Sequence, residues 1–160
     1  MSRSKPRDAR RSTPRVASDA RLGELAARLR LVITRTARRL RQEAGTELSP
    51  TQTAALATIE RHGPLTPSVL AELERVKRPT ATRIVARLTD ESLVKRATDP
   101  ADGRSFTVAA TPKGHALLGK LRTRKNAYLA RRLRRLDDPD LATLERAAEI
   151  LERLLEGERR

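Results

Sequence analysis

The sequence contains no cysteine in its 160 residues, and aromatic residues are scarce. The missing cysteines exclude disulfide bonds, thiolate metal sites and a cysteine-based redox sensor. One Phe, one Tyr and no Trp are present. Proteins that bind single-stranded nucleic acid without sequence preference stack the bases on aromatic side chains. This chain has almost none to offer, so single strands are a poor candidate partner.

Long apolar segments and enzyme motifs are missing as well. No apolar run approaches the ~20 residues of a membrane-spanning helix, and Arg10-Arg11 is not followed by the apolar segment of an export signal. We therefore expect a cytoplasmic protein without a membrane partner. His62 and His115 are the only histidines, too few for a zinc site. Since phosphate-binding glycine loops, zinc-protease motifs and nucleophile elbows are lacking, we expect no cofactor and no enzyme activity.

Basic residues are abundant. The chain has 35 Lys and Arg against 20 Asp and Glu, a formal net charge of +15. This excess favours a polyanionic partner, with nucleic acid as the first candidate and an anionic membrane as the second. A basic solvated surface without a partner is the alternative. Because aromatic residues are scarce, double-stranded DNA, read through its phosphates and groove edges, is the best fit.

The sequence divides into four predicted regions. Residues 1–17 hold six basic residues, one acid and two prolines without apolar periodicity, which predicts a disordered basic arm. This arm either contacts DNA phosphates or only aids solubility. Residues 18–47 form the N-terminal helix of a dimerisation region, residues 48–112 a DNA-binding domain, and residues 113–157 the C-terminal dimerisation helices.

Pairs of a capping residue and a proline predict where four helices begin. Such pairs place a side-chain acceptor before a proline in the first turn, and Gln52 adds the second half of a capping box. The pairs are Ser49-Pro50, Thr66-Pro67, Thr111-Pro112 and Asp138-Pro139. We expect helices over 19–45, 50–61, 67–74, 79–91, 112–136 and 139–157.

Two strand-like runs follow the fourth helix. Residues 93–97 and 105–109 flank a segment rich in Asp, Pro and Gly, which indicates a β-hairpin with Phe106 and Val108 on one face. The predicted fold is mostly α with this small hairpin: a winged helix-turn-helix with N- and C-terminal dimerisation helices. Leucines recur every three or four residues in the first and last helices. Such stripes form a dimer seam or cover the core of one chain.

The fourth helix carries the candidate DNA-binding surface. Five basic residues and no acid lie between residues 75 and 89, while Ile84, Val85 and Leu88 are predicted to face inward. The N-terminal end of such a helix faces base edges in the major groove. The candidate contacts in and beside this helix are Lys77, Arg78, Thr80, Thr82, Arg83 and Arg87.

The hairpin loop holds a second candidate contact. Arg104 follows Gly103, and an Arg at a hairpin tip can enter a narrow minor groove, where the negative potential is deepest. Asp102 can orient that guanidinium through a bidentate pair. A local surface salt bridge without any role in DNA binding is the alternative.

Residues 70–114 contain a series of short motifs in a specific order and spacing. They are Leu70-Ala71, Val76, Pro79–Val85, Leu88, Leu93–Arg96, Asp99–Arg104 and Thr111–Gly114. Together these motifs resemble the MarR family of bacterial transcriptional regulators. The resemblance implies a homodimer whose two recognition helices enter successive major grooves of a palindromic site, about 34 Å apart. It also implies that Arg83 contacts DNA. In the hairpin loop, which is called the wing, it implies that Asp102 and Arg104 form a pair.

The resemblance further implies repression, with release from DNA by a small anionic or aromatic ligand. The chain departs from the family pattern at two positions: Ser92 replaces a usual glycine, and Lys77 replaces a small capping hydroxyl. We expect turn strain at Ser92. The rival functions are a nucleoid-type protein that binds DNA without sequence preference, and a basic RNA-binding protein.

Overall fold

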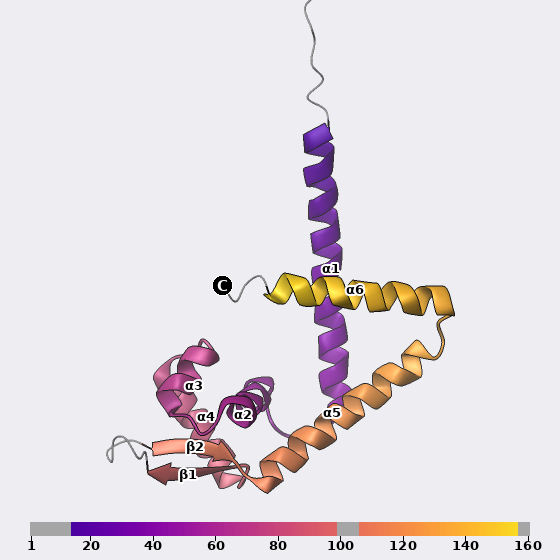
Figure 1. Cartoon of the computed structure of the whole chain (residues 1–160). Coiled ribbons are helices and arrows are strands. Elements are labelled where there is room, and N and C mark those ends of the chain that lie inside the picture. Colours follow the sequence, from indigo (N-terminus) through magenta and orange to yellow (C-terminus); the bar gives the residue numbers. More distant parts are fainter. Residues whose placement is uncertain (1–13, 99–105, 157–160) are drawn as a thin grey trace, which may run out of the picture. The chain divides into compact units, whose positions relative to one another are not determined.

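The computed structural model describes the backbone of residues 14–98 and 106–156 (Figure 1). The chain divides into two compact units, residues 1–39 and 40–160. Six helices and two strands occur in the described ranges. In chain order they are α1 (Pro14–Ala44), α2 (Pro50–His62), α3 (Pro67–Leu73), α4 (Arg78–Asp90), β1 (Val94–Thr98), β2 (Phe106–Ala110), α5 (Pro112–Leu133) and α6 (Asp138–Glu156).

The first helix, α1, is longer than the sequence predicts. It begins at Pro14, so residues 14–17 of the predicted arm are helical. Proline fits the first turn of a helix, where its missing N–H has no intrahelical partner, and no helix breaker follows directly. Gly45 ends the helix with a φ of +58°, the usual role of glycine at this position. The rest of the predicted arm, residues 1–13, lies outside the described residues.

The predicted capping residues start three of the later helices. Ser49 and Gln52 form the reciprocal capping box, with the Ser49 amide donating to Gln52 Oε1 at 2.8 Å. Thr66 and Thr111 accept hydrogen bonds from the amides three residues ahead. These hydrogen bonds confirm the three predicted caps. The caps were predictable because each depends only on neighbouring residues.

The predicted cap at Asp138 is wrong by one residue. Helix α6 begins at Asp138, and the carboxylate that accepts the Asp140 amide, at 3.0 Å, belongs to Asp137. Proline is tolerated within the first turn of a helix, at its first or its second residue. The Asp138-Pro139 pair therefore did not decide which of the two aspartates is the cap.

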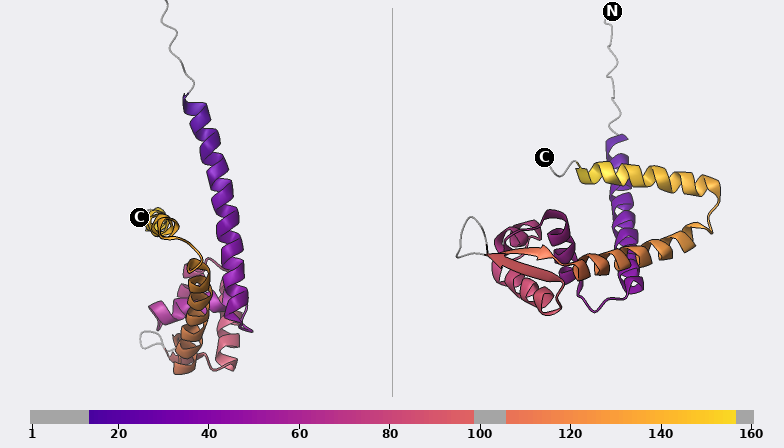
Figure 2. Two further views of the ribbon diagram at one scale, coloured as in Figure 1. Left: turned by 90° about the vertical axis from the view of Figure 1, so that its right-hand side faces the viewer. Right: turned by 60° about the horizontal axis from the view of Figure 1, so that its bottom comes forward.

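One apolar core joins α2, α3, α4, the hairpin and the start of α5. No polar or charged side chain is buried among the described residues. Figures 1 and 2 show β1 and β2 beside α2, α3 and α4. The largest fully buried side chains are Leu56, Ile59, Leu70, Leu88, Leu121, Val85 and Val108. The faces of these helices that do not pack into this core are exposed to solvent.

The hairpin pairs β1 and β2 antiparallel, with Arg96 opposite Val108. Both strands begin one residue later than predicted. The Leu93 amide, just before β1, donates to the Leu88 carbonyl at the end of α4. Val108 is fully buried and Phe106 packs against the core, so the predicted inward face is confirmed. An isolated bridge from Leu65 to Val108 ties the segment before α3 to the sheet.

The two C-terminal helices differ in burial. The first half of α5 enters the core through Gly114, Leu118 and Leu121. In contrast, α6 has no buried residue. None of the described helices combines the length and apolar character needed to cross a membrane.

Candidate nucleic-acid interface

Helices α3 and α4 form the helix-turn-helix. Leu70 of α3 and Ala81 and Val85 of α4 are buried in the same core cluster. The turn between the helices is closed by the amide of Val76, which donates to the Ala71 carbonyl at 2.9 Å. Packing and backbone hydrogen bonds thus hold α4 against α3, as the helix-turn-helix prediction requires.

The two faces of α4 are sharply different. Ala81, Ile84, Val85 and Leu88 are buried, so the prediction that the last three face inward is confirmed. The opposite face is basic and polar. The exposed candidates are Lys77, Arg78, Thr82, Arg83 and Arg87, and Thr80 is half-buried. The structure brings these six candidates together on and beside one helix; their contacts with DNA stay a prediction.

Most cations of this surface have no partner among the residues that the structure describes. In the described ranges, the side chains of Lys77, Arg78 and Arg83 make no hydrogen bond or ion pair. Arg87 differs, because its Nε lies 2.9 Å from a carboxylate oxygen of Glu91. The hydroxyl of Thr82 donates to the Arg78 carbonyl. Three guanidinium or ammonium groups are therefore available to an external anion.

The start of α4 lacks a side-chain cap. Lys77 occupies the capping position without a side-chain hydrogen bond, as expected for a residue that replaces a small hydroxyl. Its carbonyl accepts the amides of Thr80 and Ala81 at 2.9 and 3.1 Å. A helix N-terminus carries partial positive charge, which adds to the basic side chains around it.

The wing candidates Asp102 and Arg104 lie outside the described residues, so their roles stay predictions. At the base of the wing, the guanidinium of Arg96 lies over the Phe106 ring, 4.7 Å from its centroid. This contact depends on the register in which β1 pairs with β2, and the sequence alone did not predict that register.

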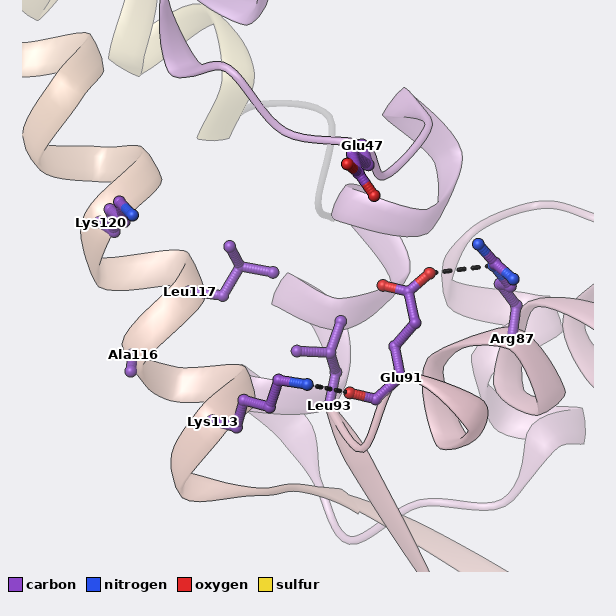
Figure 3. Close-up of a pocket in the computed structure, with 8 residues that line it drawn as sticks. All are labelled: Glu47, Arg87, Glu91, Leu93, Lys113, Ala116, Leu117 and Lys120. Carbon is purple, nitrogen blue, oxygen red and sulfur yellow. Dashed lines mark hydrogen bonds and ion pairs between the residues drawn. The ribbon is translucent and has the colours of Figure 1, made fainter.

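An open cavity of about 500 Å³ lies where the end of α4 meets α5 (Figure 3). Apolar and charged side chains both line it. Lys113 Nζ donates to the Glu91 carbonyl oxygen at 2.7 Å. The lining residues are Glu47, Arg87, Glu91, Leu93, Lys113, Ala116, Leu117 and Lys120. Arg87 therefore belongs both to this cavity and to the basic surface of α4.

Polar side chains of α5 also contact earlier parts of the chain, and the sequence did not reveal these contacts. Arg122 pairs with Glu60 at 2.8 Å, and Nδ1 of His115 lies 3.1 Å from the same carboxylate. The hydrogen bond from Arg122 lowers the pKa of Glu60, partial burial opposes this, and His115 adds to the lowering. Arg124 donates to the carbonyls of Ala44 and Gly45 at 2.8 and 3.0 Å.

Metal binding finds no support in the described part of the chain. No group of three or more His, Cys, Asp or Glu side chains there could hold a metal ion.

Comparison with known proteins agrees with this geometry. The MarR family model matches residues 48–106. An uncharacterized HTH-type transcriptional regulator of Mycobacterium bovis is 37% identical over 135 residues, which cover 84% of this chain and 92% of the relative. The chain belongs to the MarR family of transcriptional regulators. The resemblance found in the sequence is confirmed, and with it regulation of transcription by DNA binding rather than enzyme activity.

Solved structures confirm the predicted fold class. A putative transcriptional regulator from Pseudomonas aeruginosa superposes with a TM-score of 0.75 at 32% identity, covering 82% of this chain and 94% of that chain. A mutant of the Staphylococcus aureus regulator MepR, bound to an oligodeoxyribonucleotide, has a TM-score of 0.65 at 16% identity and covers 81% and 97%. The MarR protein described here thus has the winged helix-turn-helix fold of its family.

Proposed function

We propose that this MarR protein is a sequence-specific repressor that binds a palindromic site in double-stranded DNA as a homodimer. The carrying observation is the exposed face of α4, where Lys77, Arg78 and Arg83 have no partner in the described part of the chain. These cations stand on a helix held by a fully apolar core, so they meet DNA with little reorganisation of the backbone.

Helix α4 reads the major groove in this proposal. Lys77, Arg78 and Thr80 at its N-terminal end face base edges and phosphates, and Thr82 and Arg83 lie about one turn further. Arg87, near the end of the helix, contacts the flanking backbone. Support for this docking comes from the MepR mutant, which shares the fold and is bound to an oligodeoxyribonucleotide.

The wing supplies the second contact. Arg104 inserts into the adjacent minor groove, and Asp102 orients it. The hairpin supports this role because β1 and β2 pair antiparallel, and residues 99–105 connect them in the sequence. The sequence of this loop, with Gly103 before Arg104, motivates the assignment.

Two copies of the chain associate through α1 and α6. Both helices carry large apolar side chains that are exposed in the single chain, although burying such groups stabilises a protein. These side chains are Leu22, Leu25, Leu29, Leu31, Val32, Ile33, Leu144, Ile150, Leu154 and Leu155. A symmetric partner that covers them sets the spacing of two α4 helices on a palindrome.

A small anionic ligand releases the repressor. The cavity at the end of α4 offers Lys113, Lys120 and Arg87 around the apolar side chains of Leu93 and Leu117, which suits an aromatic carboxylate. Such a ligand competes with Glu91 for Arg87 and so acts directly on the basic surface of α4.

A binding titration tests the proposal. Fluorescence anisotropy is measured with the intergenic DNA beside the gene of this protein, with a scrambled duplex and with RNA, at several salt concentrations. Specific binding should exceed binding to the scrambled duplex by ~10³ or more at physiological salt. Equal affinity for both duplexes would instead support a nucleoid-type protein. A preference for RNA would support the RNA-binding alternative.

A further inference from the structure

The turn of the helix-turn-helix contains an arginine in an unusual conformation. Arg75 follows the last turn of α3 with a φ of 52°. Its amide donates to the Glu72 carbonyl at 3.2 Å, and the Val76 amide donates to Ala71 at 2.9 Å. This is the Schellman arrangement, in which the residue after the helix is usually glycine.

The turn after α4 has the same construction. The amides of Ser92 and Leu93 donate to the carbonyls of Thr89 and Leu88, at 2.8 and 2.9 Å. Ser92 has a φ of 58°, which agrees with the strain expected from its place in the sequence. The chain therefore tolerates a side chain at this kind of position, and strain alone assigns Arg75 no role.

The surroundings of Arg75 are what single it out. It is exposed, and its guanidinium has no hydrogen bond or ion pair with the described residues. The acidic residue next to it, Glu74, instead bonds to another side chain: its carboxylate accepts a hydrogen bond from the Thr58 hydroxyl. Arg75 is also the first of the five basic residues between 75 and 89, a stretch without any acid.

We propose that the Arg75 guanidinium binds a DNA phosphate beside the groove that α4 enters. Arg75 lies two residues before Lys77, the capping position of α4, and Val76 between them packs against the core. The backbone that carries the guanidinium is thus fixed relative to α4. This inference rests on the proposed DNA docking of α4 and adds a contact that positions the helix without reading bases.

Paired variants separate charge from backbone strain. Arg75→Ala removes the charge and keeps a side chain at positive φ, whereas Arg75→Lys keeps the charge. Arg75→Gly removes both the charge and the strain. Ser92→Gly is the matched control, because it relieves the same kind of strain in the equivalent turn after α4.

The measurement is anisotropy titration of the full chain with operator and scrambled duplex over a range of salt, together with thermal melts. Arg75→Ala should weaken binding to both duplexes by about 3- to 10-fold and reduce the salt slope by about 1. Arg75→Lys should bind like the wild type. Both glycine variants should melt higher than the wild type, but only Arg75→Gly should bind as weakly as Arg75→Ala.

Several outcomes would overturn the assignment. Unchanged affinity and salt slope in Arg75→Ala, with a clear loss in Arg83→Ala, would remove Arg75 from the interface and leave the docking of α4 intact. A loss confined to the operator would indicate base reading instead of a phosphate contact. No loss in either variant would reject the docking itself, and with it the proposed function.

Discussion

Arg122 binds both carboxylate oxygens of Glu60, with donor–acceptor distances of 2.8 and 3.1 Å. The two residues are 62 positions apart in the sequence and tie α5 to the end of α2. His115 approaches the same carboxylate from an earlier turn of α5. Glu60 is thus a junction between the DNA-binding core and the helix that leads away from it.

This junction should make stability depend on pH in a defined direction. Since Arg122 lowers the pKa of Glu60 below the usual 4.5, the ionised carboxylate stabilises the folded state at neutral pH. That contribution is lost as the pH falls from about 4.5 through the lower folded-state value. Arg122→Met should melt slightly below the wild type at pH 7, and the difference should shrink as the pH is lowered below about 4.5, as followed by circular dichroism.

A variant of the partner residue checks the cause. Glu60→Gln has no carboxylate to titrate at this position, so adding Arg122→Met to it should leave little of the pH-dependent difference. A melting difference of equal size at pH 7 and pH 3 would show that Arg122 acts through packing rather than through charge.

Gly114 should be required where α5 begins. A Cβ at this position would run into the carbonyl oxygen of Leu93, and the Thr111 amide donates to that same oxygen at 3.0 Å. Gly114→Ala should destabilise the protein by about 1–3 kcal/mol because the backbone must shift. Gly119→Ala is the control in the same helix: its Cβ has nothing within 4 Å, so it should stabilise by about 0.5–1 kcal/mol. Urea unfolding measures both, and an equal response would contradict this packing.

Some of these features could be predicted from the sequence because their causes are local. The caps at Ser49, Thr66 and Thr111 depend on four residues each, and the buried face of α4 follows its apolar spacing. The strain at Ser92 was expected from the resemblance to the MarR family, which usually has glycine at this position. Local patterns were ambiguous where equivalent residues stood side by side, as at Asp137 and Asp138.

Other features depend on the tertiary structure and left no signal in the sequence. The bidentate pair between Glu60 and Arg122 joins helices whose separation and register no spacing rule fixes. The same holds for Arg124, whose guanidinium donates to the carbonyl of Ala44, the last residue of α1, across 80 positions. Arg75 was visible only as one basic residue among five, because its backbone conformation depends on how α3 ends.

Arg83 should contribute more to base discrimination than Arg87. Arg83 has no partner among the described residues, whereas Arg87 must first leave the carboxylate of Glu91. Arg83→Ala should cost about 1–3 kcal/mol of operator affinity and reduce the preference over scrambled duplex. Arg87→Ala should cost less and leave that preference unchanged. Competition titrations measure both quantities, and a larger loss of preference in Arg87→Ala would reverse the assignment.

The exposed leucines of α6 should hold the dimer together. Leu144 is 47% exposed in the single chain, and Leu144→Glu would place a charge in the proposed apolar seam. We expect this variant to sediment as a monomer or to dissociate at ~10-fold higher concentration or more, since burying an unpaired charge costs several kcal/mol. Leu73→Glu is a matched control on α3, equally exposed at 47%, and should remain dimeric. Dissociation of both variants, or of neither, would remove α6 from the seam.

Lys120 should set how strongly an aromatic carboxylate acts on DNA binding. It lines the cavity at the end of α4 together with Arg87, while the other lysine, Lys113, is already bound to the Glu91 carbonyl. Benzoate, used as the probe, should lower operator affinity in the wild type, and Lys120→Met should raise the benzoate concentration needed by about 10-fold. Lys125→Met removes the same charge from α5 outside the lining of this cavity and should respond like the wild type. An equal shift in both variants would mean that benzoate senses only the net charge of α5, and an operator affinity that benzoate leaves unchanged in the wild type would reject this cavity as a site for aromatic carboxylates.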